Sequence, residues 1–244
     1  YPGVFFSQFT GAELVADKWN LSREDLDKFA LESHEKAAHA TESKYFDREI
    51  LPVEGKNAEG LNDLVMQDEG IRFDASLDKL AGLNPVTEGG VITAGNASQI
   101  TDGAAAVVIC NDAGLKKIQK NPRAEIVSIS VVGDDPVFML TGPIPASFKA
   151  LETANLSIDD MDLYEVNEAF APVPLAWAAD LKADRTKLNV NGGAMALGHP
   201  LGATGAKLMT TMLHELERRE GKYALQAICE GGGTANATII KRVS

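Results

Sequence analysis

Three side chains that could share one reaction stand where apolar runs give way to polar or glycine-rich turns. Asn167 and Cys229 each follow directly on an apolar run, and His199 lies within the glycine-rich segment 191–206. The carboxyl ends of neighbouring parallel strands are where α/β proteins place ligands. A histidine and a cysteine beside a glycine-lined pocket form a set suited to acyl transfer.

The segment around His199 is the most informative. Five glycines occur in residues 191–206, which is costly unless the backbone must turn sharply or approach another group closely. Pro200 suits the first position of a helix, so we expect His199 near a helix N-terminus, where the pKa of its imidazole is lowered. A neutral ring can donate a hydrogen bond to an oxygen that gains charge. The alternative is a structural histidine in a turn.

Cys229 and Asn167 each leave two interpretations open. A thiol at a strand end, followed by glycines whose backbone N–H groups are free, could act as an acid/base beside an anion cradle. For Cys229 the alternative is a small buried hydrophobe at a hairpin. Asn167, which Glu168 follows, could bind a ligand or could cap a helix.

A fourth segment, 93–105, is made of small residues that leave room for a narrow ligand. Ser98 could hydrogen-bond an amide of such a ligand, and the alternative is an ordinary turn made of turn-forming residues.

The elements that position these residues are expected to be strands alternating with helices. This alternation predicts an α/β sheet that helices cover on both faces. The apolar run 105–110 reads as a strand buried on both faces. The last two strands lie too close together for a crossover, so they should pair antiparallel. In the helix 145–155 we expect Phe148, Leu151 and Ala154 to point inward. The expected strands are 105–110, 125–132, 163–166, 188–190, 223–229 and 235–241, and the expected helices are 112–120, 145–155, 168–180 and 202–219.

The first hundred residues are helical, charged and rich in loops. Ser22 and Asp25 resemble a capping box, and a small apolar helix face follows. Prolines and glycines break residues 51–95 into long connections around short elements, of the kind that cover a site. The expected apolar face of the helix consists of Leu26, Phe29, Ala30, Ser33 and Ala37.

Composition excludes several classes of function. Lys and Arg total 23 against 35 Asp and Glu, for a net charge of −12, which argues against a nucleic-acid binder. No apolar run approaches the roughly 18 residues of a membrane span. Two cysteines cannot make a disulfide scaffold or a four-thiolate zinc site, and free thiols suit a reducing compartment, so we expect the cytoplasm.

The motifs together resemble the thiolases, the acyl-CoA C-acyltransferases, over the whole chain and in the same order. The resemblance implies a five-layered αβαβα fold of two similar halves and a loop domain that binds coenzyme A. The implied reaction is cleavage of a 3-ketoacyl-CoA by CoA, or the reverse Claisen condensation, without a metal or redox cofactor. The motifs are Ala94-Gly95-Asn96-Ala97-Ser98, Asn167-Glu168-Ala169-Phe170, the run Gly192 to Gly205 with Gly198-His199-Pro200, and Cys229-Glu230-Gly231-Gly232-Gly233.

By this resemblance each site residue has a role. Cys229 moves a proton on the CoA thiol or the α-carbon. His199 activates the nucleophilic cysteine and helps bind the thioester oxygen, Asn167 holds a water at that oxygen, and the Gly231 N–H belongs to a second oxyanion hole. The residues that would line the CoA tunnel are Ala94, Ala97, Ser98, Phe170 and Arg72.

The resemblance also sets domain limits and an expected oligomer. Residues 1–100 would form part of the loop domain, 101–121 would close the N-terminal half, and 122–244 would be the C-terminal half. In the family, dimers pair through N-terminal sheets and loop domains add tetramer contacts, so we expect a homo-oligomer.

The chain departs from the family in lacking a match to the acyl-accepting cysteine motif of the first half. Cys110 lies in an apolar run and is expected to be buried, so the chain, which starts at Tyr1, looks like the last three-fifths of a thiolase. Smaller departures are Glu230 in the glycine box and Ser7-Gln8-Phe9, where many members have a His-Met pair.

Two other functions stay open beside the acyltransferase. One is a non-catalytic or partner-dependent CoA-binding half-thiolase, which would need another chain for its nucleophile. The other is a ketoacyl synthase relative, which is disfavoured because synthases use two histidines where this chain offers His199 and Cys229.

Overall fold

A mixed sheet forms the centre of the computed structural model, which describes residues 1–56 and 59–243. Within these residues the sheet has four strands in the order β3-β6-β5-β4. β4 and β5 pair parallel, whereas β6 is antiparallel to both β5 and β3. This confirms the predicted antiparallel final pair. The strands are β3 (Ala124–Gly133), β4 (Leu163–Val166), β5 (Tyr223–Cys229) and β6 (Thr234–Arg242).

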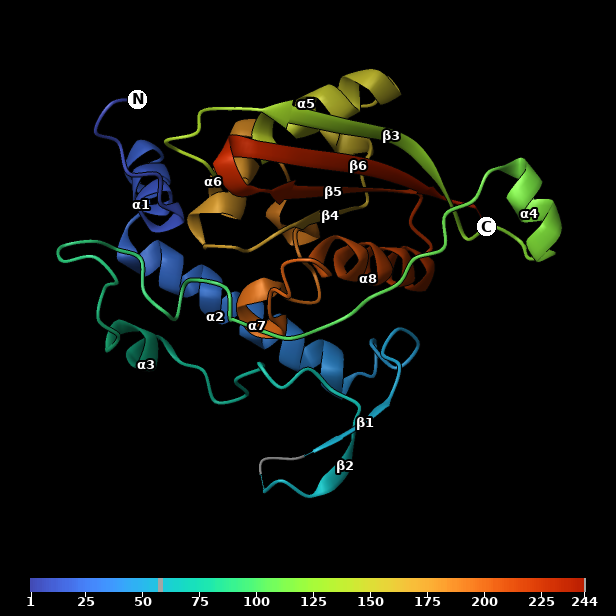
Figure 1. Ribbon diagram of the computed structural model, residues 1–244, viewed down its shortest axis with the longest axis horizontal. Coiled ribbons are helices and arrows are strands. Elements are labelled where there is room, and N and C mark those ends of the chain that lie inside the picture. The colour runs from blue at the N-terminus through green and yellow to red at the C-terminus, as the bar shows by residue number, and fades with distance from the viewer. Residues whose placement is uncertain (57–58, 244) are drawn as a thin grey trace.

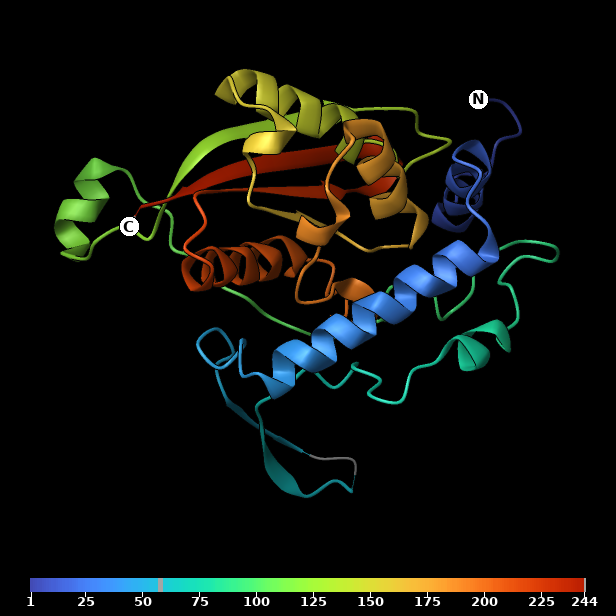
Figure 2. The same cartoon turned by 180° about the vertical axis from the view of Figure 1, so that it is seen from behind.

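Helices cover both faces of this sheet, as predicted. α5 (Pro143–Ala154) packs on β3 and β6, and α6 (Pro172–Leu181) packs beside α5. α8 (Thr204–Arg218) lies against β4 and β5 on the other side (Figures 1 and 2). The short helix α7 (Ala194–Leu197) precedes α8.

The N-terminal helices pack against this core. α1 (Gln8–Lys18) lies against α6, and α2 (Arg23–Glu42) lies against α7. The predicted capping box at Ser22 is present, with the Asp25 N–H donating to the Ser22 hydroxyl. All five residues of the predicted apolar face of α2 are buried, since they follow the helical period.

Residues 51–95 contain only short elements among long connections, as predicted. The hairpin of β1 (Val53–Lys56) and β2 (Asn62–Val65) extends away from the body (Figures 1 and 2). Across the described residues no helix is both long enough and apolar enough to cross a membrane. The remaining helices are α3 (Leu77–Ala81) and α4 (Asp112–Ile118), with short 3-10 turns at Ile158–Asp160, Arg185–Lys187 and Gly231–Gly233.

The predicted strand 105–110 is wrong. These residues are irregular and exposed, and no other described segment pairs with them. Val108 is 80% exposed, and Cys110, which we expected to be buried, is exposed as well. An apolar run becomes a buried strand only where a neighbouring strand satisfies its backbone groups, and sequence alone does not reveal whether that neighbour is there.

Three smaller expectations also differ from the structure. Phe148 is 50% exposed, because the buried face of α5 runs through Ile144, Ser147 and Leu151. The helix expected at 168–180 begins only at Pro172, since the preceding backbone is bonded to the 96–98 segment. The expected strand 188–190 is reduced to isolated bridges, one of them parallel to Tyr164.

The sheet face under α8 carries a row of buried polar side chains. Glu165 lies opposite Gln226, and Gln226 lies opposite Thr238, so the three share one face of adjacent strands. Burial raises the pKa of the Glu165 carboxyl well above its usual range, and the nearby Glu168 raises it further. The folded chain therefore holds Glu165 in its neutral form.

This protonation predicts a pH-dependent effect of Glu165→Gln. The unfolded chain releases the Glu165 proton near the ordinary pKa of glutamate while the folded chain retains it, so wild-type stability falls as pH rises above that value. The slope from this one group reaches about 1.4 kcal/mol per pH unit. Glu165→Gln removes this loss, and its free energy of unfolding relative to wild type should rise between pH 5 and pH 7 in urea titrations. A pH-independent difference, like that expected for the exposed control Glu152→Gln, would contradict the assignment.

Candidate active site

The parallel register of β4 and β5 places Asn167 and Cys229 at the same end of the sheet. Val166 lies opposite Ala227, and the Asn167 N–H donates to the Ala227 carbonyl at 3.0 Å. Cys229 ends β5 two residues beyond Ala227. With ordinary strand spacing and rise, the Cα atoms of Asn167 and Cys229 are about 6 Å apart.

His199 reaches this end of the sheet from the turn between α7 and α8. Its backbone N–H donates to the Gln99 carbonyl at 3.3 Å. Gly198, which precedes it, has φ +82°, and a Cβ there would lie 2.3 Å from the Thr101 hydroxyl oxygen, so this position needs glycine. The turn is thus fixed by contact with the 99–101 segment.

The expected position of His199 at a helix N-terminus is wrong. Pro200 does not open the helix, because α8 begins at Thr204 and His199 stands two residues after α7 ends. The pKa of the His199 imidazole is nevertheless lowered, and the cause is burial of the ring. The expected neutral ring is therefore obtained by desolvation and not by a helix dipole.

The His199 ring is held on both sides. Its Nε2 lies 3.3 Å from the Asn167 amide nitrogen, and its Nδ1 lies 2.6 Å from the Thr204 hydroxyl oxygen. Asn167 is almost fully buried, and its Oδ1 accepts no hydrogen bond from the described residues. A buried acceptor of this kind has hydrogen-bonding capacity available for a ligand or an ordered water.

Glu168 anchors the backbone beside Asn167. Its buried carboxylate accepts hydrogen bonds from the Ser33 hydroxyl, the Asn189 amide and the Met195 N–H. The Gly193 N–H in turn donates to the Ser33 hydroxyl at 3.0 Å. This network joins α2, the end of β4 and the start of the His199 segment. Asn167 does not cap the next helix, because α6 begins at Pro172 with Ala171 as its N-cap.

Cys229 is buried, with 8% of its surface exposed. Burial raises the pKa of the thiol to about 12, and the adjacent Glu230 adds to the rise. Cys229 and His199 lie at the same end of the sheet, but the ring nitrogens of His199 contact Asn167 and Thr204 and not the thiol. That Cys229 and His199 face one pocket therefore stays a prediction. The thiol is held protonated, which suits a proton donor better than a resting nucleophile.

The glycine box after Cys229 is shaped by Glu230. The Glu230 carboxylate accepts from the Asn236 amide at 2.5 Å and from the Thr234 hydroxyl at 3.2 Å, which closes the turn into β6. The Gly231 N–H has no acceptor in the described part of the chain, and a side chain at Gly231 would meet nothing. The box therefore presents a free, exposed donor, as the sequence predicts.

Four of the five predicted CoA-contacting residues lie in one strip beside Asn167. Ala97 bridges Phe170, and the Ser98 N–H donates to the Ala169 carbonyl at 2.9 Å. Ala94, which is exposed, begins the same turn. Arg72 is exposed on a separate segment, which is tied to this strip because the Gln99 amide donates to the Gly70 carbonyl at 2.8 Å.

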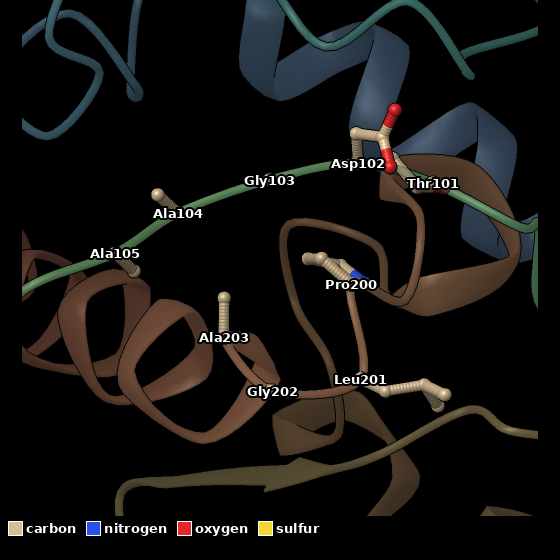
Figure 3. A pocket seen from close by; sticks show the side chains of 9 residues that line it. All are labelled: Thr101, Asp102, Gly103, Ala104, Ala105, Pro200, Leu201, Gly202 and Ala203. Carbon is tan, nitrogen blue, oxygen red and sulfur yellow. The ribbon is translucent and has the colours of Figure 1, made fainter.

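A hollow of about 460 Å³ lies between the 101–105 segment and residues 200–203. Figure 3 shows Ala203 pointing toward Ala104 and Ala105, and the Pro200 ring packs against Gly103, where a Cβ would come within 2.9 Å of it. His199, Asn167 and Cys229 do not line this hollow. Its small, mostly backbone walls carry no group that could act as an acid or base apart from Asp102.

Sequence reasoning missed two residues that hold the site. The Gln99 amide donates to both the Gly70 and Met195 carbonyls and so ties the predicted loop to the segment before His199. The other residue is Thr204, whose hydroxyl oxygen lies 2.6 Å from His199 Nδ1. A hydroxyl residue five positions after the histidine, near a helix start, is the signal that could have identified it.

Two family models match the chain. The model described as the N-terminal domain of thiolase matches residues 6–113, and the one described as the C-terminal domain of thiolase matches residues 120–242.

Several known proteins are similar over almost the whole chain. The steroid 3-ketoacyl-CoA thiolase FadA6 of Mycobacterium tuberculosis is 56% identical over 97% of the chain and 57% of its own length. The mitochondrial 3-ketoacyl-CoA thiolase of Homo sapiens is 47% identical over 94% of the chain and 58% of its own length. The chain thus spans less than two thirds of these relatives.

Solved structures confirm the expected fold. The human mitochondrial 3-ketoacyl-CoA thiolase superposes with a TM-score of 0.92 at 45% identity, over 96% of the chain and 59% of that protein. The acetyl-CoA acetyltransferase of Bacillus anthracis gives 0.93 at 40% identity, over 99% of the chain and 61% of that protein.

The two cysteines should differ sharply toward iodoacetamide. At pH 8 a thiol with a pKa of about 12 is about one part in ten thousand thiolate, so Cys229 should alkylate at least about 100-fold more slowly than the exposed Cys110. Peptide mass spectrometry of timed samples measures both rates, and Cys110→Ser isolates the slow one. Equal rates in the folded chain, as expected only in urea, would contradict the burial of Cys229.

Proposed function

The chain belongs to the thiolase family, and we propose that it carries the thioester-binding and proton-transferring part of an acyl-CoA C-acyltransferase. The proposed reaction is cleavage of a 3-ketoacyl-CoA by CoA, or condensation of two acyl-CoAs. The names of the relatives support this substrate class. The single observation that carries the proposal is the contact of a neutral His199 with Asn167, whose buried Oδ1 is unpartnered among the described residues.

His199 and Asn167 act on the thioester oxygen in this proposal. The neutral ring accepts a proton from the attacking thiol at Nε2, and the resulting Nε2–H then donates to the thioester oxygen as that oxygen gains charge. Asn167 Oδ1 accepts from a bound water, which donates its other proton to the same oxygen. Two fixed donors in a buried site stabilise an enolate far better than bulk water does.

Cys229 supplies and recovers one proton. After a thiolate adds to the 3-keto carbon, the bond between C2 and C3 breaks and its electron pair moves into the thioester enolate. The Cys229 S–H gives its proton to C2 and releases the shortened acyl-CoA. The Cys229 thiolate then takes the proton of the incoming CoA thiol, which attacks the acyl-enzyme thioester. The Gly231 N–H stabilises the oxygen of that second adduct.

This mechanism also needs an acyl-accepting thiol next to His199. No thiol is hydrogen-bonded to the ring among the described residues, and Cys110 lies on the irregular segment 104–111. We therefore propose that this thiol comes from outside these 244 residues. The same observation supports the second candidate, a partner-dependent CoA-binding half-thiolase.

Coenzyme A is a substrate in this account, and no other cofactor is required. A relative with a TM-score of 0.89 is described as a complex with CoA. We propose that CoA lies along the strip formed by Ala94, Ala97, Ser98 and Phe170, with Arg72 near its phosphates. The division into a loop domain and two thiolase parts, a homo-oligomeric assembly and a cytoplasmic location belong to the same proposal.

CoA-binding and thiolysis assays of the 244-residue chain should distinguish the acyltransferase from the partner-dependent half-thiolase. We expect the chain alone to bind CoA in calorimetry, with Ser98→Ala raising Kd about fivefold for one lost hydrogen bond. We expect no cleavage of acetoacetyl-CoA by the chain alone, and cleavage when a protein segment bearing the acyl-accepting cysteine is present.

Two outcomes would overturn parts of this account. Cleavage by the chain alone that Cys110→Ala abolishes would make Cys110 the nucleophile. CoA binding without cleavage in any context, including the complete protein, would favour the non-catalytic function. A His199→Gln variant serves as the inactive control.

A further inference from the structure

The Thr204 hydroxyl is shared between the His199 ring and a backbone carbonyl. Its oxygen lies 2.9 Å from the Pro200 carbonyl oxygen and 2.6 Å from His199 Nδ1. Thr204 is the first residue of α8 and is 2% exposed, so water does not compete for these contacts. The position of each proton can therefore be worked out from the donors and acceptors.

Only one arrangement of protons satisfies both contacts. A carbonyl oxygen has no proton to donate, so the Thr204 hydroxyl must donate its one hydrogen bond to the Pro200 carbonyl oxygen. The hydroxyl oxygen then accepts from the ring, which requires a proton on Nδ1. A neutral imidazole carries one proton, so Nε2 is unprotonated.

The other side of the ring agrees with this arrangement. An unprotonated Nε2 is an acceptor, and the group 3.3 Å away is the Asn167 amide nitrogen, which only donates. In this arrangement the Asn167 Oδ1 points away from the ring and stays without a partner among the described residues. The reverse tautomer would set two donors against each other at Asn167. It would also require the Thr204 hydroxyl to donate to Nδ1, although that hydroxyl already donates its one proton to the Pro200 carbonyl oxygen.

We propose that Thr204 is a positioning residue that holds His199 in the Nδ1–H tautomer, so that Nε2 carries no proton and its lone pair faces the Asn167 amide. Free imidazole side chains in water favour the opposite tautomer, so the protein has to impose this one. The catalytic meaning rests on the proposed function, because only a base at Nε2 can take the proton of the attacking thiol. The tautomer itself does not depend on that function.

Nitrogen NMR of the chain labelled with ¹⁵N-histidine measures the tautomer directly. The chain has four histidines, and His199→Gln assigns the signals of His199 by their loss. At neutral pH we expect a pyrrole-like Nδ1 and a pyridine-like Nε2. Thr204→Val should shift the ring toward the Nε2–H form, and Thr204→Ser should retain the wild-type pattern. Thr210→Val is the matched control, since Thr210 makes the same bond to Ala206 four residues back on α8.

The outcomes of this experiment are distinct from those of the activity test, because NMR needs no turnover. A pyridine-like Nδ1 in the wild type, or an unchanged ring in a folded Thr204→Val variant, would overturn the proposal. Circular dichroism checks folding, and Thr204→Ala replaces Thr204→Val if the latter unfolds. In a preparation that cleaves 3-ketoacyl-CoA, Thr204→Val should lower kcat about 10- to 100-fold with little change in KM, and Thr204→Ser should restore it.

Discussion

The parallel register between β4 and β5 is the constraint on which the rest of the site depends. Val166 opposite Ala227 brings the ends of both strands to one edge, and the bond from Asn167 to Ala227 extends that register by one residue. Asn167 thus lies level with Ile228, one residue short of Cys229 along the neighbouring strand. The amide that meets His199 and the thiol of Cys229 therefore share one edge because of strand pairing.

Further contacts hold the segments around this edge of the sheet in place, and burial there sets the protonation states of His199 and Cys229. The buried Glu168 joins α2 to the segment before His199, and Gln99 joins the same segment to the predicted CoA strip. Burial then keeps the His199 ring neutral and the Cys229 thiol protonated. One group is ready to accept a proton and the other to give one, which is the pairing that acid/base chemistry on a thioester requires.

Much of this was readable from the sequence, because apolar runs and capping residues follow local rules. Four strands and the capping box at Ser22 are fixed locally. The failures are all tertiary. The run 105–110 lacks a pairing strand among the described residues, the helix at 168–180 starts late because its first turn is bonded to another segment, and the His199 pKa depends on burial. The role of Thr204 depends on its hydroxyl donating to the Pro200 carbonyl oxygen while it accepts from His199, and the periodicity of a sequence does not predict such contacts.

The most direct test of the central claim is a structure of the chain with bound acetyl-CoA. The account predicts the thioester oxygen within hydrogen-bonding distance of His199 Nε2 and of a water held by Asn167 Oδ1, with the α-carbon facing the Cys229 sulfur. A thioester bound in the hollow between residues 101–105 and 200–203, away from these three side chains, would contradict it.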